Sequence, residues 1–155
     1  MRKEVISHAG PGSVPDTKWL DLDSIAMVQV TSEEQGSPID AALLEEGQGW
    51  RAASKGTQTI RLIFDKPQTV TRIWLTFHEA EIARTQEFVL RWSSGNENSF
   101  REIVRQQWNF SSPDSVQETE DYAVQLSGVT MVELIIVPDK SGGEARASLR
   151  KLRLA

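Results

Sequence analysis

The sequence of 155 residues contains no cysteine and only two histidines. The absence of cysteine excludes disulfide bonds, thiolate metal ligands and a cysteine nucleophile. The HExxH motif, the nucleophile elbow and the Gly-rich phosphate loop are also missing. General acid–base catalysis needs titratable groups held together in a cleft, and His8 and His78 stand far apart in the sequence. We therefore expect a protein that is not an enzyme and that uses no cofactor or metal.

Long apolar runs and an excess of positive charge are missing too. No apolar segment approaches the ~20 residues that a transmembrane helix requires, and the N-terminus lacks the apolar stretch of a signal peptide. The formal net charge of −5 argues against a general nucleic-acid binder, because neutralising phosphates requires a basic surface. The sequence therefore predicts a cytoplasmic protein with no membrane span and no nucleic-acid partner.

The length and composition fit one globular domain preceded by a short arm. The hydrophobic content of 39% and the charged content of 25% are usual for soluble globular proteins, and 155 residues can bury a core of ordinary size. Residues 1–15 are rich in glycine and proline and show no hydrophobic periodicity. We expect them to form a flexible N-terminal arm and residues 16–155 to form a single domain.

Period-two alternation is the main pattern that the sequence does contain. Apolar residues alternate along 59–64, 69–77 and 88–93, where Ile, Phe, Trp and Thr are frequent. This pattern is typical of strands with one buried face, and an antiparallel sheet must bury that face against a second layer. Further strands are expected at 26–30, 122–126, 130–138 and 147–155. Roughly eight strands bounded by turns predict an all-β antiparallel β-sandwich.

The segments between these strands are less regular. A short helical turn is expected at 39–44, where the preceding proline stands at an early helical position. Residues 100–110 fit a strand with a bulge or a short helix equally well. Turns or breaks are expected at 65–68 and 127–129, and a long loop at 78–87 separates two predicted strands.

Five segments, taken in order, carry a resemblance to a known family. They read VTSEE, SPIDAALLEEGQGWRA, QTIRLIFDKPQTVTRIWLTF, RTQEFVLRWSSGNENSFREI and ELIIVPDKSGGEARASLRKLRL. From about Ala26 to its end, the chain resembles the discoidin family, also called the coagulation-factor type C family. The resemblance implies a galactose-binding-domain-like jelly roll that catalyses no reaction. It also implies that glycans, phospholipid headgroups or proteins bind to loops at one end of the sandwich.

One departure from that family bears on metals. Its members often carry an Asp-Gly pair before a tryptophan, near a structural calcium, whereas this chain reads EEGQGW at 45–50. We therefore expect that folding does not need calcium. The same resemblance implies that Trp50 is a structural plug beneath the loops.

The long loop between two predicted strands holds the first candidate site residues, because binding residues gather on loops that a rigid scaffold supports. It contains His78, Glu79 and Arg84. In the sugar-binding members of the family, residues of the corresponding loop face the ligand. Arg51 directly follows the plug tryptophan and is expected at the same rim. The alternative is a solvated hairpin loop whose surface arginine binds nothing.

An aromatic ring could complete such a site by stacking on a sugar. Trp108 is the candidate, because it stands where an apolar run passes into a polar loop, although packing into the core is an equal alternative. The resemblance favours a carbohydrate ligand. An intracellular protein–protein interaction domain, as in scaffold relatives of the same fold, remains the alternative, and the oligomeric state stays open.

Overall fold

The computed structural model describes residues 18–44 and 46–155, so the predicted arm at 1–15 and the predicted domain start at 16 lie outside it. Most of the described residues lie in antiparallel strands, as the alternation predicted. The elements, in chain order, are α1 (Leu22–Ile25), β1 (Ala26–Val30), α2 (Asp40–Leu43), β2 (Trp50–Arg51), β3 (Gln58–His78), β4 (Arg84–Ser93), β5 (Arg101–Phe110), β6 (Gln117–Val137), β7 (Ser148–Leu149) and β8 (Lys151–Leu154).

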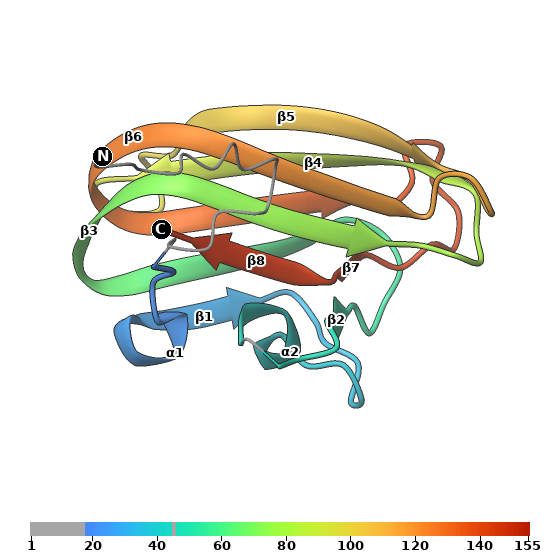
Figure 1. Cartoon of the computed structure of the whole chain (residues 1–155), viewed down its shortest axis with the longest axis horizontal. Coiled ribbons are helices and arrows are strands. Elements are labelled where there is room, and N and C mark those ends of the chain that lie inside the picture. The colour runs from blue at the N-terminus through green and yellow to red at the C-terminus, as the bar shows by residue number, and fades with distance from the viewer. Residues whose placement is uncertain (1–17, 45) are drawn as a thin grey trace, which may run out of the picture.

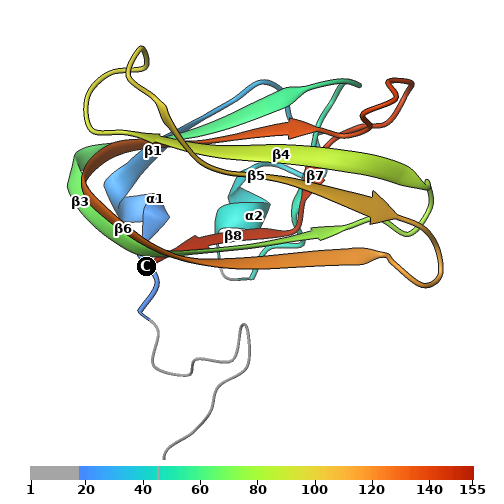
Figure 2. The same ribbon diagram turned by 90° about the horizontal axis from the view of Figure 1, so that it is seen from above.

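The strands β3 and β6 are long and bent, and each runs through both layers of a sandwich (Figure 1, Figure 2). In one layer, residues 60–64 of β3 pair with β1, and residues 58–63 pair with residues 131–136 of β6. That layer continues through β4 to β5. In the other layer, residues 72–78 of β3 pair with residues 117–123 of β6 and with β8. The layers are therefore ordered β1–β3–β6–β4–β5 and β8–β3–β6.

The breaks expected at 65–68 and 127–129 are bends inside these strands rather than turns between separate strands. The register of the β3–β6 pairing shifts between Ile63 and Arg72, and such bulges bend a strand and increase its twist. Gly128 lies at the bend of β6 with a φ of 65°, which is a conformation that favours glycine. The prediction of separate strands here was wrong because a bend and a turn use the same residue types.

The core lies between the two layers and consists of the predicted apolar faces. Ile60 and Leu62 come from the first half of β3, and Leu75 and Phe77 come from its second half; all four are buried. The rings of Phe77 and Phe88 stack across the layers with centroids 5.2 Å apart. Burying each such side chain contributes about 1.5–3 kcal/mol. The apolar residues whose alternation predicted the strands therefore also stabilise the packing of the two layers against each other.

The two long sides of the sandwich are closed by different means. On one side, α1 contacts β1 and α2 contacts β8, so the predicted helical turn at 39–44 is confirmed and bridges the layers (Figure 1). Lys151 donates a hydrogen bond to the carbonyl oxygen of Leu44 at 2.7 Å, which satisfies a carbonyl at the end of α2. On the other side stands the edge strand β5, so of the two alternatives for 100–110 the strand is correct, and it covers Arg101–Phe110. Within the described residues, no helix has the length and apolarity needed to cross a membrane.

One end of the sandwich carries four of the loops that connect the strands. The loops at 31–39, 79–83, 111–116 and 138–147 all lie at the right-hand end in Figure 1, next to β2 and β7. The long loop expected at 78–87 is shorter, because β3 continues through His78 and β4 already begins at Arg84. This change moves part of the predicted site from a loop into a strand.

Candidate functional site

A two-stranded sheet forms the base of the candidate site. Trp50 of β2 pairs with Leu149 of β7, and Arg51 pairs with Ser148. The Trp50 side chain is buried, and its Nε1 donates a hydrogen bond to the carbonyl oxygen of Ser32 at 3.0 Å. The indole therefore anchors β2 beneath the loop after β1, which agrees with the predicted role of a structural plug.

The approach of β2 to β7 depends on Gly49. Its φ is 106°, in the left-handed region that favours glycine. A Cβ at this position would lie 3.0 Å from the carbonyl oxygen of Leu149 and 3.1 Å from the Cα of Arg150. The glycine thus permits a close backbone contact that places Ser148 and Arg150 beside the β2 residues.

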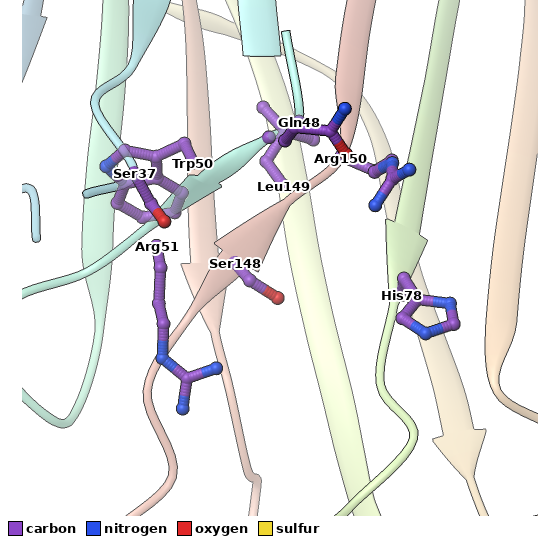
Figure 3. Close-up of a pocket in the computed structure, with 9 residues that line it drawn as sticks. Ser37, Gln48, Trp50, Arg51, His78, Ser148, Leu149 and Arg150 are labelled. Atoms are coloured by element: carbon purple, nitrogen blue, oxygen red, sulfur yellow. The ribbon is translucent and has the colours of Figure 1, made fainter. Parts of the chain in front are cut away.

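Above this sheet lies a cavity of about 180 Å³ (Figure 3). Its lining brings together segments from distant parts of the chain: Ser37, Gln48, Gly49, Trp50, Arg51, His78, Ser148, Leu149 and Arg150. In Figure 3 the Ser148 hydroxyl lies between Arg51 on one side and His78 and Arg150 on the other. Two of the predicted site residues, His78 and Arg51, therefore share one cavity.

The charge around the cavity is predominantly positive. Glu34 is shared by two arginines: its carboxylate lies 3.9 Å from Nε of Arg51 and 3.5 Å from Nη1 of Arg146, and all three side chains are 42% exposed. None of the described residues that line the cavity is Asp or Glu. The exposed Arg150 side chain makes no hydrogen bond or ion pair with a described residue, and only its backbone is fixed, by a hydrogen bond to the Thr76 carbonyl oxygen at 2.9 Å.

Arg84 and Glu79 lie elsewhere, inside the protein. The expectation that Arg84 stands on an exposed loop was wrong, because it is the first residue of β4 and only 4% exposed. Its Nε is 2.8 Å from Oε1 of Glu79, and its Nη1 donates to the Pro138 carbonyl oxygen at 2.7 Å. Burial alone would raise the pKa of Glu79, but hydrogen bonds from Arg84 and from the Glu81 backbone outweigh it, so the pKa is lowered. This geometry favours a structural role for Arg84.

A chain of polar contacts continues from Arg84 between the layers. Arg84 donates to Oε1 of Gln86 at 3.2 Å, and Gln86 donates to Oε1 of Glu118 at 3.1 Å. Burial of Glu118, together with the nearby charge of Glu120, raises the pKa of Glu118 to about 8. Tyr122 donates to Oε2 of Glu120 at 2.8 Å. We refer to the following residues as the interior polar cluster: Glu79, Arg84, Gln86, Trp108, Glu118, Glu120 and Tyr122.

Trp108 belongs to this cluster and not to the cavity. It lies inside β5 rather than in a polar loop, opposite Gln86 in the β4–β5 pairing. The ring is partly buried against the core, and its Nε1 is buried without a hydrogen-bond partner in the described part of the chain. Of the two alternatives for Trp108, this position favours packing.

Sequence reasoning did not find Ser148 and Arg150. Leu149 is buried, and neighbouring residues of a strand point to opposite faces, which is a signal that Ser148 and Arg150 face outward. The pairing of β7 with β2 carried no such signal, because β2 has only two residues and gives no periodicity.

The chain can now be compared with known proteins. No protein-family model matches it, and no curated protein matches its sequence. Solved structures do match: the CBM32 carbohydrate-binding module of AlyQ in complex with 4,5-unsaturated mannuronic acid is 14% identical, with a TM-score of 0.63, over 90% of this chain and 98% of that one. The family 32 module of NanJ from C. perfringens in complex with galactose is 14% identical, with a TM-score of 0.58, over 83% and 92% of the two chains.

A pectin-binding carbohydrate-binding module gives a similar result, at 17% identity and a TM-score of 0.58 over 84% of this chain and 89% of that one. At these identities the comparisons establish the fold. The chain has the all-β, galactose-binding-like sandwich of these modules, as the sequence predicted.

Proposed function

We propose that the protein is a non-catalytic carbohydrate-binding module that binds a glycan in the loop-end cavity. The observation that carries this proposal is the convergence of polar groups from β2, β3 and β7 on one cavity, at the end of a sandwich shared with sugar-binding modules. We further infer that the chain is related to discoidin domains, on the strength of the segments quoted above. In this proposal Arg51, His78, Ser148 and Arg150 contact the ligand.

The size and chemistry of the cavity support a sugar. At about 180 Å³, the cavity is smaller than the roughly 300–1,000 Å³ of sites for drug-sized ligands, so it suits one sugar ring or the end of a chain. Arginine, glutamine, serine and histidine side chains supply donors and acceptors for hydroxyl groups. Among the described lining residues there is no cluster of carboxylates that could serve as acid and base, which is the arrangement that glycoside hydrolysis requires.

The alternative function, a protein–protein interaction domain, receives less support. Such a surface usually shows a contiguous apolar patch. Among the described residues, the exposed large apolar side chains are Met27 on β1, Leu44 after α2 and Ile82 in the loop at 79–83. They stand on three separate elements, and Ile82 alone is in one of the loops at the functional end.

Titration calorimetry with the whole chain tests the proposal. The ligands are neutral and acidic monosaccharides and short oligosaccharides, presented as methyl glycosides. We expect saturable binding of at least one of them, and loss of that binding in Ser148→Val, which removes a hydroxyl at the centre of the cavity. Lys66→Gln is the control, because Lys66 is exposed at the opposite end of the sandwich. If no saccharide binds, or if Lys66→Gln abolishes binding as well, the proposal is wrong.

A further inference from the structure

The loop-end cavity combines two features that together restrict its ligand. The first is an excess of cationic side chains over carboxylates. Arg51, Arg146 and Arg150 lie in or beside the cavity, and Glu34 is the acid that two of them share at 3.9 and 3.5 Å. The chain as a whole is acidic, with a formal net charge of −5, so this concentration of positive charge is local.

The second feature is the lack of a stacking surface. Trp50 is the aromatic ring among the described lining residues, apart from the imidazole of His78, and it is only 1% exposed. Its Nε1 is already bonded to Ser32. A ligand therefore gains little from contact with an aromatic face, and most of its binding energy must come from hydrogen bonds and charge.

Arg150 is the group best placed to provide that charge. Its backbone is fixed by the hydrogen bond to Thr76 and by the buried neighbouring side chain of Leu149. Its guanidinium, however, is not committed to any described residue. A guanidinium presents paired donors that match the two oxygens of a carboxylate, and these charge-assisted bonds are about twice as strong as neutral ones.

From these observations we propose that the cavity selects sugars that carry a carboxylate, that is, hexuronates, and that Arg150 binds the carboxylate. Arg51 contributes a second positive charge from the other side of Ser148, weakened by its pairing with Glu34. Ser148 and His78 then face the ring hydroxyls. This inference rests on the proposed function, because it specifies the sugar that the same cavity binds.

Matched pairs of ligands test the inference and keep it separate from the proposed function. The probes are the methyl glycosides of galactose, mannose and glucose, and those of galacturonic, mannuronic and glucuronic acid. Within each pair the ring stereochemistry is the same and only the carboxylate differs. We expect at least one hexuronide to bind about tenfold or more tightly than its hexose partner, and this preference to shrink when salt is raised, since exposed charges are screened.

Variants of the whole chain locate the effect. Arg150→Gln keeps hydrogen-bonding capacity but removes the charge, and it should abolish the preference while the melting temperature stays unchanged. Arg150→Lys should restore part of the preference, because it returns the charge without the paired donors. Lys66→Gln removes the same unit of charge at the opposite end and should leave the preference intact.

Each other outcome overturns a defined part of the argument. Hexose binding as tight as hexuronate binding in every pair would overturn the inference and leave the proposed function standing. Binding of none of the six would overturn the inference, and absence of binding by the oligosaccharides as well would overturn the proposed function. An equal loss of preference in Arg150→Gln and Lys66→Gln would show that total charge is responsible. Galactose 6-sulfate binding as tightly as galacturonate would show that the cavity accepts any anion, which would overturn the assignment to uronates.

Discussion

The loop-end cavity and the interior polar cluster each contain an arginine paired with a glutamate, but the first pair is exposed to solvent and the second is buried. At the cavity, the lining residue Arg51 lies 3.9 Å from Glu34 beside it, and both side chains are 42% exposed. In the cluster, Arg84 lies 2.8 Å from Glu79, with side-chain exposures of 0% and 12%. An exposed pair contributes little to stability, whereas breaking a buried one is costly. Exposure, rather than residue type, thus separates an arginine that is available to a ligand from one that holds the fold.

Arg84 shows how a buried guanidinium is held by the protein through Nε and Nη1, while its Nη2 is buried without a hydrogen-bond partner in the described part of the chain. It contacts Glu79, Gln86 and the Pro138 carbonyl oxygen, and its guanidinium lies 4.9 Å from the centre of the Phe110 ring. These partners come from the loop after β3, from β4, from the residue after β6 and from β5. Arg84 therefore ties together four segments of the protein, whereas the side chain of Arg150 makes no hydrogen bond or ion pair with a described residue.

The largest effect is expected for Arg84→Ala. Removing the guanidinium leaves Glu79 charged and partly buried and leaves the Pro138 carbonyl oxygen unpaired, so we expect a loss of roughly 3–5 kcal/mol in the free energy of unfolding. Denaturant titration measures it, with Arg146→Ala as the control for an exposed arginine. A loss below about 1 kcal/mol, accompanied by loss of ligand binding, would place Arg84 with the cavity and break the comparison.

Glu118 should give the next largest effect, as a dependence of stability on pH. Its pKa in the folded protein is about 8, raised from 4.5 mainly by burial, so the folded state holds a proton that the unfolded state has released. The contribution of Glu118 to the free energy of unfolding should be highest below about pH 4.5, fall as the pH rises to about 8, and then level off. Each pKa unit corresponds to about 1.4 kcal/mol, which makes the total a few kcal/mol.

Glu118→Gln is the variant that isolates this effect, because glutamine can still accept the hydrogen bond from Gln86 but does not titrate. The other ionisable groups that face Glu118 are Arg84, Glu120 and Tyr122, and the variant retains them. The free energy of unfolding of both proteins is measured across pH 4–9. Between about pH 4.5 and 8 it should fall more steeply with pH in the unaltered protein than in Glu118→Gln. If the free energy of unfolding depends on pH in the same way in both proteins, the pKa of Glu118 is not raised and water reaches its carboxyl group.

A small effect is expected for Arg51→Ala. Its pair with Glu34 is half exposed and long, so the free energy of unfolding should fall by about 0–1 kcal/mol. Thermal unfolding of this variant beside Arg84→Ala compares the two regions directly. A loss as large as that of Arg84→Ala would show that the cavity arginines also hold the fold together.

Calcium should produce the smallest effect, namely none. The segment at 45–50 lacks the Asp-Gly pair that the discoidin resemblance associates with a structural calcium. A cation that binds only the folded state raises the melting temperature by mass action. Melting curves in calcium chloride and in a chelator should therefore coincide, and a rise of several degrees with calcium would show that the folded chain binds the cation.

The sequence was a good guide to the sandwich and a partial guide to the site. Ile60, Leu75 and Phe88 were assigned correctly to the core, because strand periodicity depends only on neighbouring residues. Arg84 was placed on a loop, and Trp108 was left open between packing and binding, since an amphipathic arginine or tryptophan at the edge of an apolar run has the same local sequence whether it is buried or exposed. Their positions depend on which strands pair, and that is decided by contacts between residues far apart in the chain.

His78 and Arg51 were grouped correctly, but for an incomplete reason. They were expected to meet because both stand near loops. They meet because β2 pairs with β7, so that Arg51 lies opposite Ser148 in the same small sheet. A two-residue strand has no periodicity to detect, and this is why Arg150 could not be added to the group from sequence alone.

The bent strands have a consequence for how the molecule assembles. Gln58 pairs with Ile136, and His78 pairs with Gln117, within the same two strands. Neither layer can be completed before these distant segments meet. We therefore expect the protein to fold more slowly than most domains of its size, on the order of milliseconds to seconds. Because β3 and β6 belong to both layers, neither layer can detach alone, and we expect a single cooperative transition. The cavity therefore exists only in the fully assembled chain, and any loss of the folded form is a loss of the cavity.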